Sequence, residues 1–214
     1  MNAKYVVFDG LDGSGKGTQI DVLKERFVDA AVFTREPGGT PFAEEIRKIV
    51  RDNPLAERST ALSNLLLFFA AREELQHNLV APMLQAGKHV FSDRGDSSTF
   101  AFQLCGEQHK ELRSVFVTLR QLVFSGPGRH SPDLYVVFDL PAEIARERAT
   151  RDTNRVATHF DMRDLAYYER VRGGFHEFAS RIEAPVVFID ATLPREEVHK
   201  RVLEVLATKE VFPT

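Results

Sequence analysis

Five short apolar runs constrain the fold of this 214-residue chain more than any other feature. Each run is rich in Val and Phe, and several contain or end in Asp. They cover residues 4–9, 31–35, 88–94, 133–140 and 185–190. Short runs with little alternation are typical of strands that are covered on both faces. Because longer segments with helical spacing separate the runs, the sequence predicts an α/β fold. We expect a five-stranded parallel sheet with right-handed crossovers, flanked by helices.

The segments between the runs carry apolar residues at helical spacing. After the first run, Ile20, Leu23 and Phe27 have the spacing i, i+3, i+7. The longest predicted helix covers residues 60–85. Further helices are predicted near 43–50, 111–124, 142–150, 163–180 and 195–207. The sequence has no internal repeat and no long linker, so we predict a single domain over residues 1–214 with inserted mobile parts.

The composition is that of an ordinary soluble globular protein, with 43% hydrophobic and 28% charged residues. The formal net charge of −3 provides no basic field for a nucleic acid polymer. The single cysteine, Cys105, excludes an intramolecular disulfide and a multi-cysteine zinc site, and it fits a reducing compartment. No apolar stretch is long enough to span a bilayer, and Asp9 interrupts the first run, which argues against a signal peptide. We therefore expect a cytoplasmic protein with no membrane partner.

Polar and glycine-rich segments follow three of the predicted strands. They cover residues 9–18, 35–40 and 93–98. In open parallel sheets, ligands bind beyond the carboxyl ends of the strands. We therefore expect these three segments to gather at one edge of the sheet and to form a ligand site there.

The segment FDGLDGSGKGTQ, residues 8–19, predicts a phosphate-binding loop. Glycines let the backbone curl so that several N–H groups point at one anion, and the following helix adds its free N–H groups. Lys16 can bridge the outer phosphates as a point charge. The usual pattern has Ser or Thr directly after the lysine, where a hydroxyl helps to hold Mg²⁺, but here Gly17 stands there. Thr18, one place later, could provide that hydroxyl directly or through water. A plain glycine-rich turn is the alternative. The predicted nucleotide-binding residues are Gly10, Leu11, Asp12, Gly13, Ser14, Gly15, Lys16, Gly17 and Thr18.

Four further segments carry a resemblance to a known family. They are TREPGGTPFAEEIR at 34–47, the stretch from LLLFF to TFAFQ at 65–103, SPDLYVVFDLPAEIARERA at 131–149 and NRVATHFDMRDLAYYERVRGGF at 154–175. In order and spacing they resemble the thymidylate kinases of the bacterial type. The Lys-Gly-Thr-Gln order of the loop resembles adenylate kinases, which are also nucleoside monophosphate kinases. The resemblance covers roughly residues 4 to 180.

The resemblance implies a three-layer P-loop NTPase fold and a reaction. The reaction is transfer of the γ-phosphoryl group of ATP to dTMP with Mg²⁺, which gives dTDP for dTTP synthesis. It further implies a homodimer, and a lid segment at about residues 146–162 that closes over ATP.

Matching residues near the phosphates receive roles by the same resemblance. Asp12 holds the 3′-hydroxyl of dTMP, Arg35 and Arg94 grip its phosphate, and Asp93 associates with Mg²⁺ together with Thr18. Guanidinium groups suit this task because two anions must approach each other. Taken from the residues alone, an alternative stays open for each. Asp12 would be a solvated carboxylate, Arg35 a surface arginine, and Asp93 with Arg94 a local ion pair.

For the base and sugar, the resemblance implies that Phe68 stacks on thymine and that Arg72 contacts its O4. The two residues are four apart on the predicted long helix, so they share a face. Thr99, Phe102 and Gln103 line the sugar and base, and the ring of Phe102, where the family often has Tyr, crowds a ribose 2′-hydroxyl. Core packing is the alternative for Phe68, and burial in a helix is the alternative for the other three.

A cluster of arginines lies between the fourth predicted strand and the helix predicted at 163–180: Arg146, Arg148, Arg151 and Arg155. By resemblance the lid supplies a catalytic arginine, because Gly13 occupies the loop position that carries an arginine in the other type of the family. Arg151 and Arg155 are the candidates, and a solvated charged surface is the alternative. The predicted catalytic residues are Lys16, Asp12, Arg94, Arg151 and Arg155.

Two other functions stay open at this point. Gly95, where the family usually has Tyr or His, and Phe102 are compatible with a kinase for another monophosphate, such as dUMP or a modified deoxypyrimidine, or for several. A nucleotide-binding P-loop switch without an acceptor is the alternative from another class. Arg35 and Arg94 argue against the switch, because a switch has no second phosphate to hold.

Overall fold

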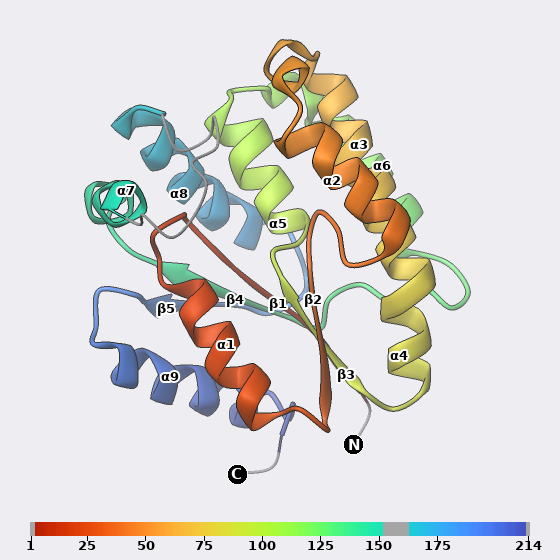
Figure 1. Ribbon diagram of the computed structural model, residues 1–214, viewed down its shortest axis with the longest axis vertical. Helices are drawn as coiled ribbons and strands as arrows, with labels where there is room; N and C mark the ends of the chain where they lie inside the picture. The colour runs from red at the N-terminus through yellow and green to blue at the C-terminus, as the bar shows by residue number, and fades with distance from the viewer. Residues whose placement is uncertain (1–2, 152–162, 213–214) are drawn as a thin grey trace.

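The computed structural model describes residues 3–151 and 163–212, and the strands in these ranges form one parallel sheet (Figure 1). The sheet has five strands in the order β2-β3-β1-β4-β5. The strands are β1 (Tyr5–Gly10), β2 (Ala31–Arg35), β3 (His89–Asp93), β4 (Leu134–Asp139) and β5 (Val186–Asp190). Each strand lies within one residue of a predicted apolar run, so the predicted parallel sheet is confirmed.

Helices connect and cover the strands. They are α1 (Lys16–Arg26), α2 (Pro41–Arg51), α3 (Ala61–Leu75), α4 (Ala81–Gln85), α5 (Asp96–Ser98), α6 (Arg113–Phe124), α7 (Ala142–Arg151), α8 (Leu165–Ala179) and α9 (Arg195–Thr208). The predicted helix at 60–85 consists of α3, the π-helical η2 (Gln76–Val80) and α4. A second run, α5 followed by the π-helical η3 (Thr99–Gly106), was not among the predicted helices. In the described ranges, no helix has the length and apolarity that a membrane span needs.

Side chains of β1 alternate between two apolar layers. Val6 and Phe8 belong to the cluster that contains Leu23 of α1. Val7 belongs to the cluster that contains Phe69 of α3. Helices α1 and α9 therefore cover one face of the sheet, while α3 and α6 lie on the other (Figure 1). Helix α8 contributes to both clusters, with Tyr168 in the first and Phe178 in the second. The result is a three-layer fold with the sheet in the middle.

The strand register brings three carboxyl ends together. Phe8 of β1 lies opposite Asp93 of β3, and Arg35 of β2 lies opposite the same Asp93. The loop after β1, the turn after β2 and the segment after β3 therefore meet at one edge of the sheet, as the sequence predicts.

Candidate active site at the carboxyl edge of the sheet

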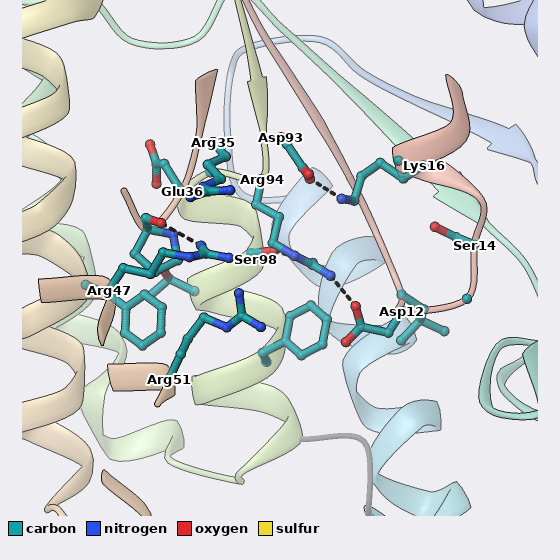
Figure 2. A pocket seen from close by; sticks show the side chains of 18 of the residues that line it. Asp12, Ser14, Lys16, Arg35, Glu36, Arg47, Arg51, Asp93, Arg94 and Ser98 are labelled. Atoms are coloured by element: carbon teal, nitrogen blue, oxygen red, sulfur yellow. Dashed lines mark hydrogen bonds and ion pairs between the residues drawn. The ribbon is translucent and has the colours of Figure 1, made fainter. Parts of the chain in front are cut away.

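A cavity of about 730 Å³ opens at this edge (Figure 2). Its volume is within the range of small-molecule sites. Of the predicted nucleotide-binding loop, residues 11–18 line the cavity, whereas Gly10 ends β1 and does not. All of the residues predicted to bind dTMP line it: Asp12, Arg35, Phe68, Arg72, Arg94, Thr99, Phe102 and Gln103. The structure therefore brings both predicted half-sites into one cavity.

Glycine shapes the loop between β1 and α1. Gly13 has a φ of 81° and Gly15 has a φ of 80°, values that strain residues with a side chain. A Cβ at Gly13 would also overlap the carbonyl oxygen of Ala145 and lie 2.9 Å from the backbone nitrogen of Ala149. The loop is thus packed directly against α7, with no room for a side chain at position 13. Gly17 differs, because a Cβ there would have no atom within 4 Å.

Lys16 begins α1 and forms an ion pair with Asp93 (Figure 2). Burial raises the pKa of the Asp93 carboxyl, but Lys16 and Arg94 outweigh burial, so the pKa lies below its usual value. Thr18 is exposed and lines the same cavity. Among the described residues, no group of three or more His, Cys, Asp or Glu side chains could hold a metal ion by itself. Mg²⁺ commonly binds one or two carboxylates plus substrate phosphates, so Asp93 and Thr18 fit the ion.

Arg94 is held at the centre of the cavity by oxygens from β1, the loop and α5. Its Nη1 donates to Asp9 Oδ1 at 3.2 Å and to Ser98 Oγ at 2.9 Å, and its Nη2 donates to Asp12 Oδ1 at 2.8 Å. Asp9 is fully buried and accepts hydrogen bonds from the hydroxyls of Ser97 and Ser98 at 2.6 and 2.7 Å. Burial raises the pKa of Asp9, although Arg94 opposes the shift. Burial lowers the pKa of Arg94, but Asp12 and Asp9 outweigh it, so the guanidinium stays charged.

Three arginines form one wall of the cavity. Arg35 donates to Glu44 Oε2 at 3.0 Å, and Arg47 donates to the carbonyl oxygen of Pro37 at 2.7 Å. Arg47 and Arg51 of α2 extend into the cavity from the side opposite the loop (Figure 2). Burial, followed by the charges of Arg51 and Arg35, lowers the pKa of Arg47 to about 10. This concentration of positive charge favours an anionic ligand.

Two phenylalanine rings face the cavity from different elements. Phe69 is buried in the core, with its ring centroid 5.4 Å from that of Phe116. Its neighbour Phe68 is only half-buried and lines the cavity. Phe102 lies beneath Arg94, whose Cζ is 4.8 Å from the centroid of the ring. The structure thus places Phe68, and not Phe69, within reach of a ligand.

Arg72, Phe68 and Gln103 border one end of the cavity, which we call the base end. The side chain of Arg72 is 1% exposed. Its Nε donates to Glu36 Oε2 at 2.7 Å, and its Nη2 donates to Thr99 Oγ1 at 2.9 Å. In the part of the chain that the structure describes, Arg72 Nη1 and Gln103 Oε1 are buried without a hydrogen-bond partner. Buried polar atoms are rarely left unpaired, so these two atoms indicate a ligand with complementary groups.

Comparison with known proteins identifies the family. A family model for thymidylate kinase matches residues 8–202. The chain belongs to the thymidylate kinase family. The thymidylate kinase of Shewanella amazonensis is 34% identical over 209 residues, which are 96% of this chain and 96% of the relative. A crystal structure of thymidylate kinase from Ehrlichia chaffeensis matches with a TM-score of 0.75 and 29% identity, covering 96% of this chain and 100% of that chain. The predicted family and the P-loop fold are therefore confirmed, and the enzyme class is that of a kinase.

Of the two predicted lid arginines, Arg151 and Arg155, only the first lies within the described residues. Arg151 ends α7, its side chain is 79% exposed, and its Nη2 pairs with Glu147 Oε1 at 2.7 Å. Arg155 lies outside the described residues, as does most of the predicted lid. Arg148, one turn before Arg151, lines the cavity and donates to the carbonyl oxygen of Ala191 at 2.9 Å. The catalytic roles of Arg151 and Arg155 stay predictions.

Sequence reasoning missed several residues of the cavity. They include Glu36, Arg47, Arg51 and Ser98, whereas Arg148 belongs to the predicted arginine cluster but was not chosen as a catalytic candidate. Arg47 and Arg51 are four apart on α2, whose buried positions include Ile46 and Val50. That spacing shows that both arginines share a face of α2, but not that this face borders a cavity. No comparable signal marks Glu36, which lies in a turn between a strand and a helix.

Gly95 is explained by packing against β1. The family usually has Tyr or His at this position, but here a Cβ would lie 2.9 Å from Cγ1 of Val7. The neighbouring Val7 therefore favours glycine. Because Gly95 lines the cavity, its missing side chain leaves space next to Arg94.

Proposed function

We propose that this protein transfers the γ-phosphoryl group of ATP to dTMP, and that the two nucleotides meet at the carboxyl edge of the sheet. The observation that supports this most is the presence of two sets of phosphate-binding groups in one cavity. The loop with Lys16 forms the first set, and Arg35 with Arg94 forms the second. Two anions can approach only where positive charge reduces their repulsion. A nucleotide switch needs the first set alone.

ATP is assigned to the loop. Backbone N–H groups of residues 13–18 and the start of α1 surround its outer phosphates. The phosphates replace Asp93 as the partner of Lys16, which frees the carboxylate. Asp93 and Thr18 would hold Mg²⁺, which when bound supplies charge neutralisation on the phosphates.

dTMP is assigned to the other half of the cavity. Phe68 stacks on the base, Arg72 donates to it, and Asp12 accepts a hydrogen bond from the 3′-hydroxyl. Arg35 and Arg94 hold the phosphate so that one of its oxygens attacks the γ-phosphorus in line. Closure of the lid excludes water, which would otherwise accept the phosphoryl group.

A panel of acceptors tests this assignment. Purified protein with ATP and Mg²⁺ is supplied with dTMP, dUMP, a 5-modified dUMP, dCMP or no acceptor. ADP release is measured and the phosphorylated product is identified by mass. We expect the highest kcat/KM with dTMP and dTDP as the product. Higher kcat/KM with dUMP or its modified form would establish the alternative kinase, and slow hydrolysis that no monophosphate stimulates would establish a switch.

We further propose that the protein is a homodimer. Six of the eight large apolar side chains that are exposed in the described ranges lie on α2, α3 and α6. They are Phe42, Ile49, Leu62, Leu66, Val117 and Leu122. These helices neighbour one another (Figure 1), and concentrated exposed apolar surface marks protein–protein contacts.

We propose a cytoplasmic location on the evidence of the cysteine. Cys105 is the single cysteine of the sequence, and its thiol is free and buried. A chain without disulfides suits a reducing compartment, where the nucleotide substrates are also expected.

A further inference from the structure

Four buried polar side chains form a row behind the base end of the cavity. The hydroxyl of Tyr5 donates to Glu36 Oε1 at 3.3 Å, and Arg72 Nε donates to Glu36 Oε2 at 2.7 Å. On its other side, Arg72 Nη2 donates to Thr99 Oγ1 at 2.9 Å. All four side chains are buried, and all but Tyr5 line the cavity. The row therefore links the core of the sheet to the ligand site.

The guanidinium of Arg72 cannot rotate without breaking these bonds. Nε and Nη2 are held by acceptors from two different segments, and Cζ lies 4.6 Å from the ring centroid of Phe69. In a planar group held at two nitrogens, the direction of the third nitrogen is also set. That third nitrogen is Nη1, which has no partner among the described residues. A residue that lines the cavity thus carries a donor of fixed direction.

Charge balance alone does not explain this geometry. A buried arginine needs a nearby anion, and Glu36 provides one. A carboxylate could satisfy that need by bonding any of the three nitrogens. Here Glu36 accepts a hydrogen bond from Nε and Thr99 accepts one from Nη2, which leaves Nη1 without a partner among the described residues.

We propose that Glu36 is a positioning residue of the acceptor site: it orients Arg72 so that Nη1 donates to an oxo group of the base. The inference rests on the proposed function, because it takes a pyrimidine monophosphate as the acceptor. Thymine and uracil carry an oxygen acceptor at position 4, whereas cytosine carries an amino donor there. Arginine has no acceptor to offer that amino group. Glu36 therefore contributes to base selection through Arg72 without touching the base.

Binding of two matched nucleotides tests this role. dTMP and 5-methyl-dCMP carry the same methyl group and differ at position 4 and in the proton on N3. We expect the preference for dTMP, measured as a ratio of Kd values, to fall about tenfold or more in Glu36→Ala. KM for dTMP should rise more than kcat falls. Glu36→Gln should keep the preference within about threefold, because its amide oxygen can still accept from Nε.

Two further variants separate a loss of Arg72 orientation from a general loss of binding or folding. Glu44→Ala removes the carboxylate that pairs with Arg35, a residue that lines the cavity, and should weaken binding of both nucleotides alike while keeping the ratio of their Kd values. Thermal unfolding shows whether Glu36→Ala folds. If it does not, Thr99→Val frees Arg72 from the other side, and we expect a reduced preference there.

The outcomes distinguish this inference from the function on which it rests. An unchanged Kd ratio in folded Glu36→Ala overturns the role of Glu36. If that variant does not fold, an unchanged ratio in Thr99→Val overturns the orientation of Arg72 by its two partners, on which the role of Glu36 depends. A wild-type protein that binds neither nucleotide and phosphorylates neither overturns the proposed function itself.

Discussion

Lys16 and Arg94 are already paired with carboxylates in the cavity. Lys16 contacts Asp93, and Arg94 contacts Asp12 at 2.8 Å. An incoming phosphate therefore replaces one anionic partner of each cation with another. The arrangement keeps buried charges compensated before the substrates bind, because an unpaired buried charge is costly.

Replacing Lys16 with Met removes the point charge on the outer phosphates of ATP. We expect turnover with ATP and dTMP to fall by about a thousandfold or more, because this charge opposes the negative charge of the transition state. Lys24→Met is the matched control: Lys24 lies on the same helix and pairs with Asp21 at the surface. Steady-state kinetics measure the effect, and circular dichroism checks the fold. Near-normal turnover of the Lys16 variant would contradict the assignment of the loop.

The raised pKa of Glu36 makes the free energy of unfolding of this protein depend on pH. Burial raises the pKa of Glu36 from 4.5 to about 7; Asp96 adds to the increase, while Arg72 and the hydroxyl of Tyr5 oppose it. Because the folded-state pKa is the higher one, the folded protein keeps a proton that the unfolded chain has lost. The contribution of Glu36 to stability therefore falls as pH rises from 4.5, the ordinary pKa, to about 7, the pKa in the folded protein. Glu36→Gln does not titrate, so its Tm relative to the wild type should increase from about pH 5 to about pH 7. If thermal melts show that the Tm difference between Glu36→Gln and the wild type stays constant or decreases over this pH range, the raised pKa of Glu36 is refuted.

Single residues differed in how well the sequence revealed them. Lys16 could be predicted from the glycine-rich loop pattern, and Asp93 and Arg94 because they adjoin the end of a predicted strand, where the edge of a parallel sheet collects such residues. Glu36 and Arg51 could not be predicted as residues of the cavity. Nothing in a turn sequence indicates that its carboxylate is buried, and a helix analysed for its apolar face does not show which polar residues enter a cavity.

The loop after β1 and helix α7 act as one packed unit. Gly13→Ala places a Cβ in left-handed backbone and against the carbonyl oxygen of Ala145. We expect it to lower the free energy of unfolding by about 2 kcal/mol or more and to weaken ATP binding. Gly17→Ala is the control, because no atom lies within 4 Å of its Cβ and it is in a helix. It should be neutral or stabilising by about 0.5–1 kcal/mol. Denaturant unfolding and ATP titration measure both; equal stability of the two variants would show that the loop tolerates a side chain at position 13.

The elements differed in their predictability for a physical reason. Strands that are buried on both faces appear as apolar runs, so their bounds were predictable to within one residue. The run α5–η3 is also buried on most sides, including Thr99, Phe100, Ala101, Leu104 and Cys105. Helical periodicity is a contrast between a buried and an exposed face, and a segment covered on most sides shows little contrast. This helical run therefore escaped prediction.

The architecture of the whole molecule followed from the order of its elements. Alternating strands and helices predict a parallel sheet, and a parallel sheet predicts where the loops converge. Individual contacts did not follow, because they join distant parts of the chain. Asp9 and Arg94, which are 85 residues apart, are an example. Such pairings depend on the strand order and on side-chain packing.

A dimer through α2, α3 and α6 predicts the effect of a charge at that surface. Leu66 of α3 is 47% exposed, and Leu66→Glu would bury a carboxylate in the proposed interface. We expect light scattering at micromolar concentration to give a dimer for the wild type and at least a tenfold weaker dimer for Leu66→Glu, about 1.4 kcal/mol or more. Val28→Glu, at an exposed site after α1 on the other layer, should leave the dimer intact. A monomeric wild type, or an unchanged dimer in Leu66→Glu, would exclude this interface.

The contact between Gly13 and α7 restricts how this enzyme can change over evolutionary time. An arginine at position 13 requires α7 to move outward, because the carbonyl oxygen of Ala145 occupies the place of its Cβ. A guanidinium supplied from the loop is therefore incompatible with the present position of α7. A laboratory lineage could place an arginine at position 13 only by coordinated changes there and in α7, and a single codon would not suffice.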